Sequence, residues 1–232
     1  MRRGGTGGWK MPLSLRLCMS HLKPMVKRRR LAGMIRNAWH ACISEHYVYA
    51  EINSEAALQT LFCTYLFREF EVHKKDKVWR LFVEPRLESE DGNSVVLPDV
   101  LVCNARRIVG AIELKYAPRV AAAWEKDMNT LAGLANRSGA TGLKIGNKRY
   151  LGPTGKLIKE YEIAEDALFV WASVSAKELN YEEAPAGLKE RQLLIAEAIT
   201  SPDDSPRLQY RGSVGERWRR KYPPDASRDI AL

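Results

Sequence analysis

Two neighbouring apolar segments each carry charged residues, and this pattern limits the folds that the chain can adopt. Asp99 lies in an apolar run over residues 95–103, and Glu113 and Lys115 lie in a second run over residues 107–116. An ionised side chain costs several kcal/mol or more to bury unless a partner compensates it. The chain must therefore fold so that these three charges meet one another or a ligand.

The two runs predict β-strands, and the short loop at residues 104–106 predicts that they pair as an antiparallel hairpin. Side chains alternate along a strand, so Glu113 and Lys115 share one face. A three-residue loop places Asp99 diagonal to Glu113 on that face, and a five-residue loop places it directly opposite. An even-length loop sends the two acids to opposite faces. The odd-length pairing brings the carboxylates within about 5 to 8 Å at the backbone.

Two interpretations of this cluster follow from the residues alone. Mg²⁺ prefers oxygen ligands and would compensate two buried carboxylates; it can also activate a water and stabilise charge on a phosphate. Lys115 could then hold that water or neutralise developing charge. Alternatively, Lys115 forms a structural salt bridge with Asp99 or Glu113. Strand geometry does not separate the two interpretations.

The remaining periodicity predicts an α/β protein. A helix capped by Asn53 or Ser54 is expected at 53–71, because Leu58, Phe62 and Leu66 form an apolar stripe. The other expected elements are a helix from about 31 to 46, a strand at 77–87, a helix beginning at Pro118 and running to 137, a hairpin at 149–161, a buried strand at 167–175 and a helix at 185–199.

Two acids on the predicted helices are candidates for the same site. Glu55 lies within about 20° of Phe62 and Leu66 around its helix, so we expect it to face the core. An acid favoured by the helix N-terminus is the alternative explanation for Glu55. Asp127 falls among the apolar positions of the second helix, and we interpret it as a half-buried structural acid.

The spacing of the hairpin residues resembles a known signature. Pro98-Asp99, followed after thirteen residues by Glu113-Leu114-Lys115, resembles the motif of the PD-(D/E)XK nuclease superfamily. The core of that superfamily has the order helix, three strands, helix, strand, and the elements predicted over roughly 50–176 have a similar order. The resemblance implies a restriction-endonuclease-like α/β fold with a mixed sheet flanked by helices.

The resemblance also implies an activity and a set of site residues. The expected function is a Mg²⁺-dependent DNA endonuclease that hydrolyses phosphodiester bonds, with Mn²⁺ as a substitute ion. The implied catalytic residues are Asp99, Glu113, Lys115 and Glu55, and the implied metal ligands are Asp99, Glu113, Leu114 and Glu55. Duplex or branched DNA is the expected partner, and a homodimer is left open. The alternative is a catalytically inactive nuclease-like module for DNA binding or interaction.

The charge distribution divides the chain into three parts. The net charge is +9, and residues 1–30 hold nine basic residues and no acid, which leaves 28 Lys and Arg against 28 Asp and Glu in the rest. We expect a basic tail at 1–33, a nuclease-like domain at 34–200 and a basic peripheral segment at 201–232. The tail is a disordered segment, an over-extended gene start or an arm that contacts phosphates.

Nucleic-acid contacts are expected from basic residues around the 149–161 hairpin, above all Lys148, Arg149 and Lys156. A second basic cluster contains Arg207, Arg211, Arg217, Arg219, Arg220 and Lys221, with Tyr210 and Trp218 among them. A solvated charged face is the alternative for each cluster.

The cysteines and the apolar runs indicate the compartment. The four cysteines are widely spaced and form no C-x-x-C pair, which predicts reduced thiols and a cytoplasmic location. No run approaches the roughly 20 apolar residues of a membrane-spanning helix, so we expect no membrane partner.

Overall fold

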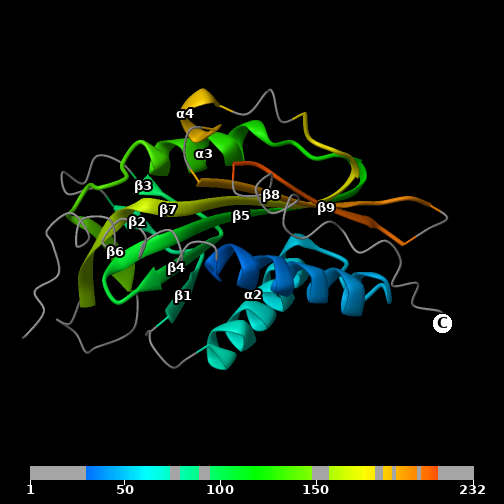
Figure 1. Ribbon diagram of the computed structural model, residues 1–232, viewed down its shortest axis with the longest axis horizontal. Coiled ribbons are helices and arrows are strands. Elements are labelled where there is room, and N and C mark those ends of the chain that lie inside the picture. Colours follow the sequence, from blue (N-terminus) through cyan, green and yellow to red (C-terminus); the bar gives the residue numbers. More distant parts are fainter. Residues whose placement is uncertain are drawn as a thin grey trace, which may run out of the picture.

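The computed structural model describes residues 30–73, 79–88, 95–147, 157–180, 185–189, 192–202 and 205–213. They form an α/β protein with helices on both faces of a mixed, open sheet (Figure 1). The helical elements are residues 30–42, the π-helical turn η1 (Ile43–Tyr47), α2 (Glu55–Val72), α3 (Glu125–Ala135) and α4 (Ala186–Lys189). The strands are β1 (Trp79–Val83), β2 (Leu87–Glu88), β3 (Val95–Val96), β4 (Val100–Asn104), β5 (Arg107–Ala121), β6 (Leu143–Asn147), β7 (Leu157–Lys177), β8 (Gln192–Ile199) and β9 (Arg207–Arg211).

The long strand β7 organises the nine-stranded sheet formed by the described residues. It pairs in parallel with β5 on one side and with β8 on the other, and its first residues pair antiparallel with β6. The order β1-β4-β5-β7 continues through β6 to β2 and β3, while β8 leads to β9. The candidate strand β5 therefore lies in the middle of the sheet, between β4 and β7.

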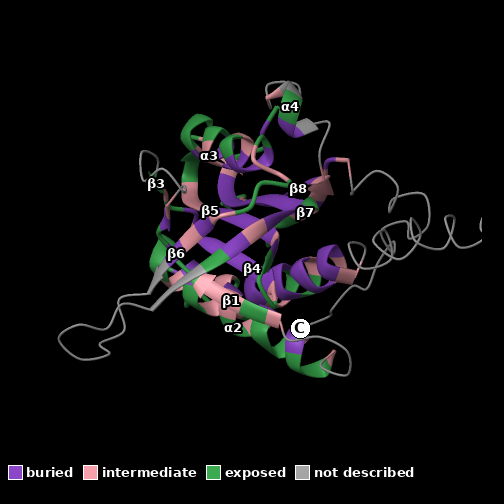
Figure 2. Ribbon diagram, turned by 90° about the vertical axis from the view of Figure 1, so that its left-hand side faces the viewer, coloured by how far each residue is buried: buried purple, intermediate pink, exposed green. Residues whose placement is uncertain are grey.

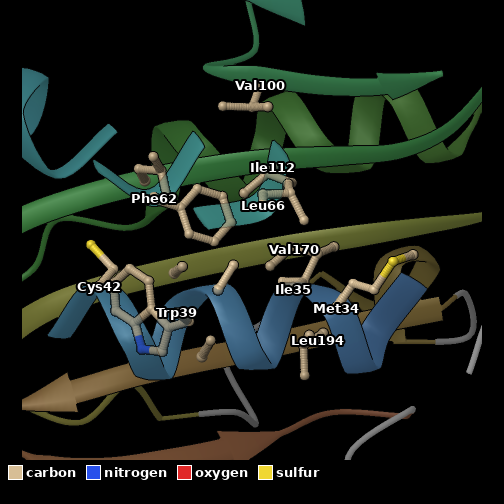
Figure 3. Packing of buried hydrophobic residues seen from close by; sticks show 14 of the residues in the cluster. Met34, Ile35, Trp39, Cys42, Phe62, Leu66, Val100, Ile112, Val170 and Leu194 are labelled. Carbon is tan, nitrogen blue, oxygen red and sulfur yellow. The ribbon is translucent and has the colours of Figure 1, made fainter. Parts of the chain in front are cut away.

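Apolar side chains cover both faces of the central strands, which appear in the buried colour in Figure 2. The 30–42 helix and α2 pack on one face, where Ile35, Trp39 and Phe62 meet Ile112 and Val170 (Figure 3). On the other face, α3 and α4 cover a second cluster that contains Phe169, Trp171, Leu193, Ile195, Met128, Leu131 and Leu188. Burial on both faces is typical of parallel central strands.

The first two predicted helices are confirmed. The Ser54 hydroxyl caps α2 by accepting a hydrogen bond of 3.2 Å from the Ala57 amide, and the helix buries Leu58, Phe62 and Leu66. Residues 30–33 had been assigned to the tail, but they begin the first helix, and Leu31 and Ala32 are buried in the core.

The predicted helix at 185–199 is wrong. Among the described residues of this segment, only Ala186–Lys189 is helical, and Gln192–Ile199 forms β8 between β7 and β9. Leu193, Leu194 and Ile195 are all buried, because the two faces of β8 are both covered. A short continuous apolar run does not reveal its period, so it fits a helix or a buried strand. Residues 207–211, placed in a peripheral segment, form the adjacent strand β9.

The predicted helix start at Pro118 is also wrong. The strand β5 continues through Pro118 to Ala121, and α3 begins only at Glu125. The pairing of β5 with β4 ends at Ile112, opposite Val100, the first residue of β4. The later part of β5 therefore has an open edge on that side. A proline, which lacks an N–H, is tolerated at such an edge. The Thr200 hydroxyl donates a hydrogen bond of 2.6 Å to the Pro118 carbonyl.

Two other predicted strands are each split in two. The 77–87 strand breaks near Glu84, which has a φ of 46°, into β1 and β2; the 95–103 strand breaks at Pro98 into β3 and β4. The hairpin predicted at 149–161 corresponds to the antiparallel pair β6 and β7, and its turn lies outside the described residues. The predicted strand 167–175 is the second half of β7. Among the described helices, none has the length and apolar character needed to cross a membrane.

Candidate active site

The β4–β5 hairpin places Asp99 and Glu113 on one face by a route that differs from the predicted one. Its turn has two residues, Ala105 and Arg106, and an even-length loop should separate the acids. A β-bulge at Val109 adds one residue to β5, and beyond it Val100 pairs with Ile112. This register sets Asp99 directly opposite Glu113. The expected shared face is therefore confirmed, with the bulge correcting the parity of the turn.

Asp99 is held by hydrogen bonds at both its side chain and its backbone. Its Oδ2 accepts a bond of 2.6 Å from the Leu114 amide, and its carbonyl accepts bonds from the Glu84 amide (2.7 Å) and from Gln59 Nε2 (3.2 Å). Burial raises the pKa of Asp99, and the Leu114 amide and the Glu113 carboxyl partly offset this by hydrogen bonding. The position of Asp99 is thus fixed before any ligand arrives.

Glu113 is a buried acid with one oxygen that lacks a partner. The residue is 5% exposed, and its Oε1 has no hydrogen-bond partner among the described residues. Burial, together with the charges of Asp99 and Asp127, raises the pKa of Glu113 to about 9. A pKa of about 9 keeps Glu113 protonated at neutral pH unless a metal ion binds beside it. Such an unpaired buried oxygen is costly and is characteristic of functional positions.

Lys115 lies between acids that come from both helical layers. Its Nζ is 3.5 Å from Glu55 Oε2 on α2 and 4.0 Å from Asp127 Oδ2 on α3, and its side chain is 30% exposed. The salt-bridge interpretation named Asp99 or Glu113 as the partner, but the ion pairs of Lys115 are with the two helix-borne acids. Lys115 still lowers the pKa of Asp99 through its charge.

Glu55 does not face the core as expected. Its side chain is 45% exposed at the start of α2, where Oε2 also accepts a hydrogen bond of 3.2 Å from the Tyr116 amide. Asp99 and Glu55 thus bind the amides of Leu114 and Tyr116 in turn, along the edge of β5 that β4 leaves open. Both acids therefore have a structural task as well as a place beside Lys115.

Sequence reasoning missed Gln59 and Trp171, and it predicted Asp127 to be half-buried although the residue is buried. Gln59 is buried one turn after Glu55 and supports Asp99; a polar residue between Leu58 and Phe62 was the available signal. Trp171 pairs in register with Glu113, and its indole N–H donates to Asp127 at 3.3 Å. Nothing local distinguishes Trp171 from other buried aromatics, because its role depends on α3.

Only part of the predicted ligand set is arranged to bind a magnesium ion. Within the described ranges, no three His, Cys, Asp or Glu side chains are grouped so that they could hold a metal ion by themselves. Glu55 is engaged with Lys115 and Tyr116. The Leu114 amide donates to Asp99, but this bond does not involve the Leu114 carbonyl oxygen, which is the atom by which Leu114 would bind a metal ion. Asp99 and Glu113 remain as a carboxylate pair with a free oxygen. Mg²⁺ commonly uses one or two carboxylates and retains several waters, so this pair fits it.

Most of the residues predicted to contact nucleic acid lie outside the described part of the chain. Lys148, Arg149 and Lys156 lie outside it, as do residues 217–221. Arg207 and Arg211 are described, and they pair with Glu178 and the fully buried Glu197. Arg211 therefore neutralises a buried acid of the fold, whereas Arg207 remains 65% exposed in its pair with Glu178.

The three cysteines in the described part of the chain do not add a nucleophile to the site. Cys42, Cys63 and Cys103 are free, and burial raises the pKa of each to about 12. A thiol with such a pKa carries almost no thiolate at neutral pH.

Comparison of the chain with protein-family models, curated proteins and solved structures gives no match. The chemistry of the site must therefore be inferred from its own residues.

Proposed function

We propose that this chain is a Mg²⁺-dependent nuclease, restriction-endonuclease-like in fold, that hydrolyses phosphodiester bonds in DNA. The observation that carries the proposal is the pair formed by the half-buried Asp99 and the buried Glu113, whose Oε1 lacks a partner in the described part of the chain, beside the partly exposed Lys115. Two adjacent acids with raised pKa values beside a lysine are expected at a catalytic centre rather than in a core.

The order of the elements supports the proposal. Helix α2, strands β1, β4 and β5, helix α3 and strand β7 follow one another in the chain, and β1-β4-β5-β7 are neighbours in the sheet. This is the order helix, three strands, helix, strand of the superfamily that the sequence resembles. The strands β2, β3 and β6 are insertions in that order, and β8 and β9 extend the sheet.

Each residue has a definable task in this proposal. A Mg²⁺ ion bound by Asp99 and Glu113 would supply Lewis-acid activation of a water and stabilise charge on the phosphate. Asp99 is fixed by its backbone bonds, and Glu113 must give up its proton to act as an anionic ligand. Lys115 can present its ammonium to the water or to a phosphate oxygen, since part of its side chain reaches solvent.

One observation favours the alternative, an inactive nuclease-like module for DNA binding or interaction. Lys115 pairs with both Glu55 and Asp127, so its charge is already compensated within the fold. A module without chemistry would keep these ion pairs for stability alone, and it would not need the free oxygen of Glu113.

The deciding experiment is a cleavage assay with the full chain. Purified protein is incubated with supercoiled plasmid, linear duplex, branched and single-stranded DNA and RNA, each with Mg²⁺, Mn²⁺ or a chelator. We expect metal-dependent cleavage of DNA, with plasmid nicking as the sign of an endonuclease, and no cleavage by Lys115→Ala. Metal binding without cleavage would favour the inactive module. A protein that shows no metal binding and no cleavage would refute the nuclease proposal.

We expect Glu55→Gln to reduce cleavage much less than Asp99→Asn. The amide oxygen of glutamine can still accept from the Tyr116 N–H, and Glu55 lies at the partly exposed border of the site. Single-turnover rates should fall by about tenfold for Glu55→Gln and by at least about a thousandfold for Asp99→Asn. Equal and complete losses, with both proteins folded, would show that Glu55 is a principal ligand.

A further inference from the structure

Asp127 is a buried acid whose contacts exceed those needed for a structural role. The residue is 7% exposed, and its Oδ2 both accepts a hydrogen bond of 3.3 Å from the Trp171 indole and lies 4.0 Å from Lys115 Nζ. One oxygen thus joins a fixed aromatic side chain to the lysine of the candidate site.

Trp171 supplies the fixed point of this arrangement. It is 1% exposed on the central strand β7, in parallel register with Glu113, and it packs in the core beneath α3. Its indole N–H is a donor only, so it orients an acceptor and cannot replace one. The carboxylate of Asp127 is therefore held in one orientation at the side of Lys115 that faces α3.

The general preference of helices for acids does not account for Asp127. Glu125 and Asp127 both lie in the first turn of α3, where an acid stabilises the helix by interacting with its N-terminal dipole. Glu125 meets that preference while remaining exposed. Burying a second acid in the same turn costs free energy that the dipole interaction of about 0.3–1 kcal/mol at the surface does not offset.

We propose that Asp127 is a positioning residue that holds the Lys115 ammonium beside the Asp99–Glu113 pair. Glu55 on α2 forms an ion pair with the same ammonium from the other face of the sheet. The two acids together restrict the positions that the Lys115 ammonium can occupy. This inference rests on the proposed function only in assigning Lys115 to catalysis. The restriction of Lys115 itself is a property of the protein without metal or DNA.

The substitution Asp127→Asn tests the proposal, with Glu125→Gln as the matched control. The asparagine keeps the volume and an oxygen for the Trp171 N–H but removes the charge beside Lys115. Glu125→Gln removes one acid from the same helical turn without touching the site. Thermal melts establish that both variants are folded.

The first measurement is the mobility of the Lys115 ammonium in protein without metal or DNA. Nitrogen-15 lysine labelling gives its order parameter, and the signal is assigned by its loss in Lys115→Arg. We expect the order parameter to fall in Asp127→Asn and to be unchanged in Glu125→Gln. An unchanged value in Asp127→Asn would overturn the proposal, whether or not the protein cuts DNA.

The second measurement is single-turnover cleavage. Misplacing a reacting group by about 1 Å can cost up to about a hundredfold, so Asp127→Asn should cut about ten- to a hundredfold more slowly. Mg²⁺ affinity and KM should stay within about twofold of the parent, because Asp127 is not a ligand in this proposal. A mobile Lys115 with an unchanged cleavage rate would overturn the positioning role. If Lys115 becomes mobile in Asp127→Asn but the parent protein never cuts DNA, the restriction of Lys115 by Asp127 is established and only the proposed function is refuted.

Trp171→Phe provides a second route if Asp127→Asn does not fold. It removes the N–H that orients Asp127 and keeps most of the aromatic volume, so both readouts should change in the same direction by a smaller amount. No change in the mobility of Lys115 would contradict the role of Trp171 in fixing Asp127.

Discussion

Lys115→Ala is expected to abolish DNA cleavage while leaving Mg²⁺ binding largely intact, whereas Asp99→Asn or Glu113→Gln should remove both. Each acid variant deletes an anionic oxygen from a hard cation, while the lysine repels the ion and acts on water or phosphate. Single-turnover rates should fall by at least about a thousandfold in all three variants. Calorimetric titration with Mg²⁺ and Mn²⁺ separates the lysine variant from the acid variants.

Thermal melts of the same proteins test the salt-bridge interpretation. Breaking a fully buried ion pair costs about 3 to 5 kcal/mol. Lys115 is 30% exposed and Glu55 is 45% exposed, so solvent screening reduces the contribution of that pair to about 1 kcal/mol. The charge left without a partner on the Asp127 side chain, which is 10% exposed, adds to the loss expected for Lys115→Ala. Lys126→Ala, which removes an exposed lysine of α3, is the matched control. Severe destabilisation by Lys115→Ala, combined with no metal binding in the parent, would refute the nuclease proposal.

Glu113→Gln is expected to stabilise the metal-free protein, and the gain should increase as the pH rises. The folded state holds the pKa of Glu113 at about 9, against an ordinary value of 4.5. Between these values the folded protein keeps a proton that the unfolded chain has lost, so the stability of the parent falls with rising pH. The difference between the two pKa values sets an upper bound of about 6 kcal/mol on this loss. The glutamine variant has no such proton, and its stability should depend less on pH.

Urea unfolding at pH 5, 7 and 8.5 in the presence of a chelator measures this effect, with Glu125→Gln as the control for removing an exposed acid. The stability difference between Glu113→Gln and the parent should widen by several kcal/mol over this range. Added Mg²⁺ should stabilise the parent but not the variant, and its affinity for the parent should rise by up to about tenfold per pH unit below 9. A stability difference that is the same at every pH would contradict the raised pKa of Glu113.

Local patterns predicted the parts of the fold that depend on neighbouring residues. The α2 helix was recognisable because its cap, Ser54, and its stripe of Leu58, Phe62 and Leu66 all lie within one segment. The strand β8 was mistaken for a helix because its partners β7 and β9, which bury both of its faces, are distant in sequence. Its apolar run contains no information about them.

In the candidate site, too, features encoded by neighbouring residues were predicted, and contacts between distant segments were not. Asp99, Glu113 and Lys115 stood out because each charge interrupts an apolar segment. The contacts of Lys115 with Glu55 and Asp127 depend on how the two helices dock on opposite faces of the sheet, which no spacing along the chain encodes. The bulge at Val109 had one available signal, since glycine within a strand often marks a bulge and Gly110 follows it.

The bulge sets the register of β5 relative to β4 and thereby the face on which each later side chain lies. Every side chain of β5 beyond Val109 owes its face to that single additional residue. If Val109 paired with β4 instead of forming the bulge, every later position of β5 would shift by one residue relative to β4. Ile112 and Leu114 would then take the places of Glu113 and Lys115, and the charges would enter the apolar layer beneath α2. Deletion of Val109 would keep Asp99 opposite Glu113, because it removes the unpaired residue and leaves the pairs on either side intact. Deletion of Ala111, beyond the bulge, would shift the charged positions to the other face.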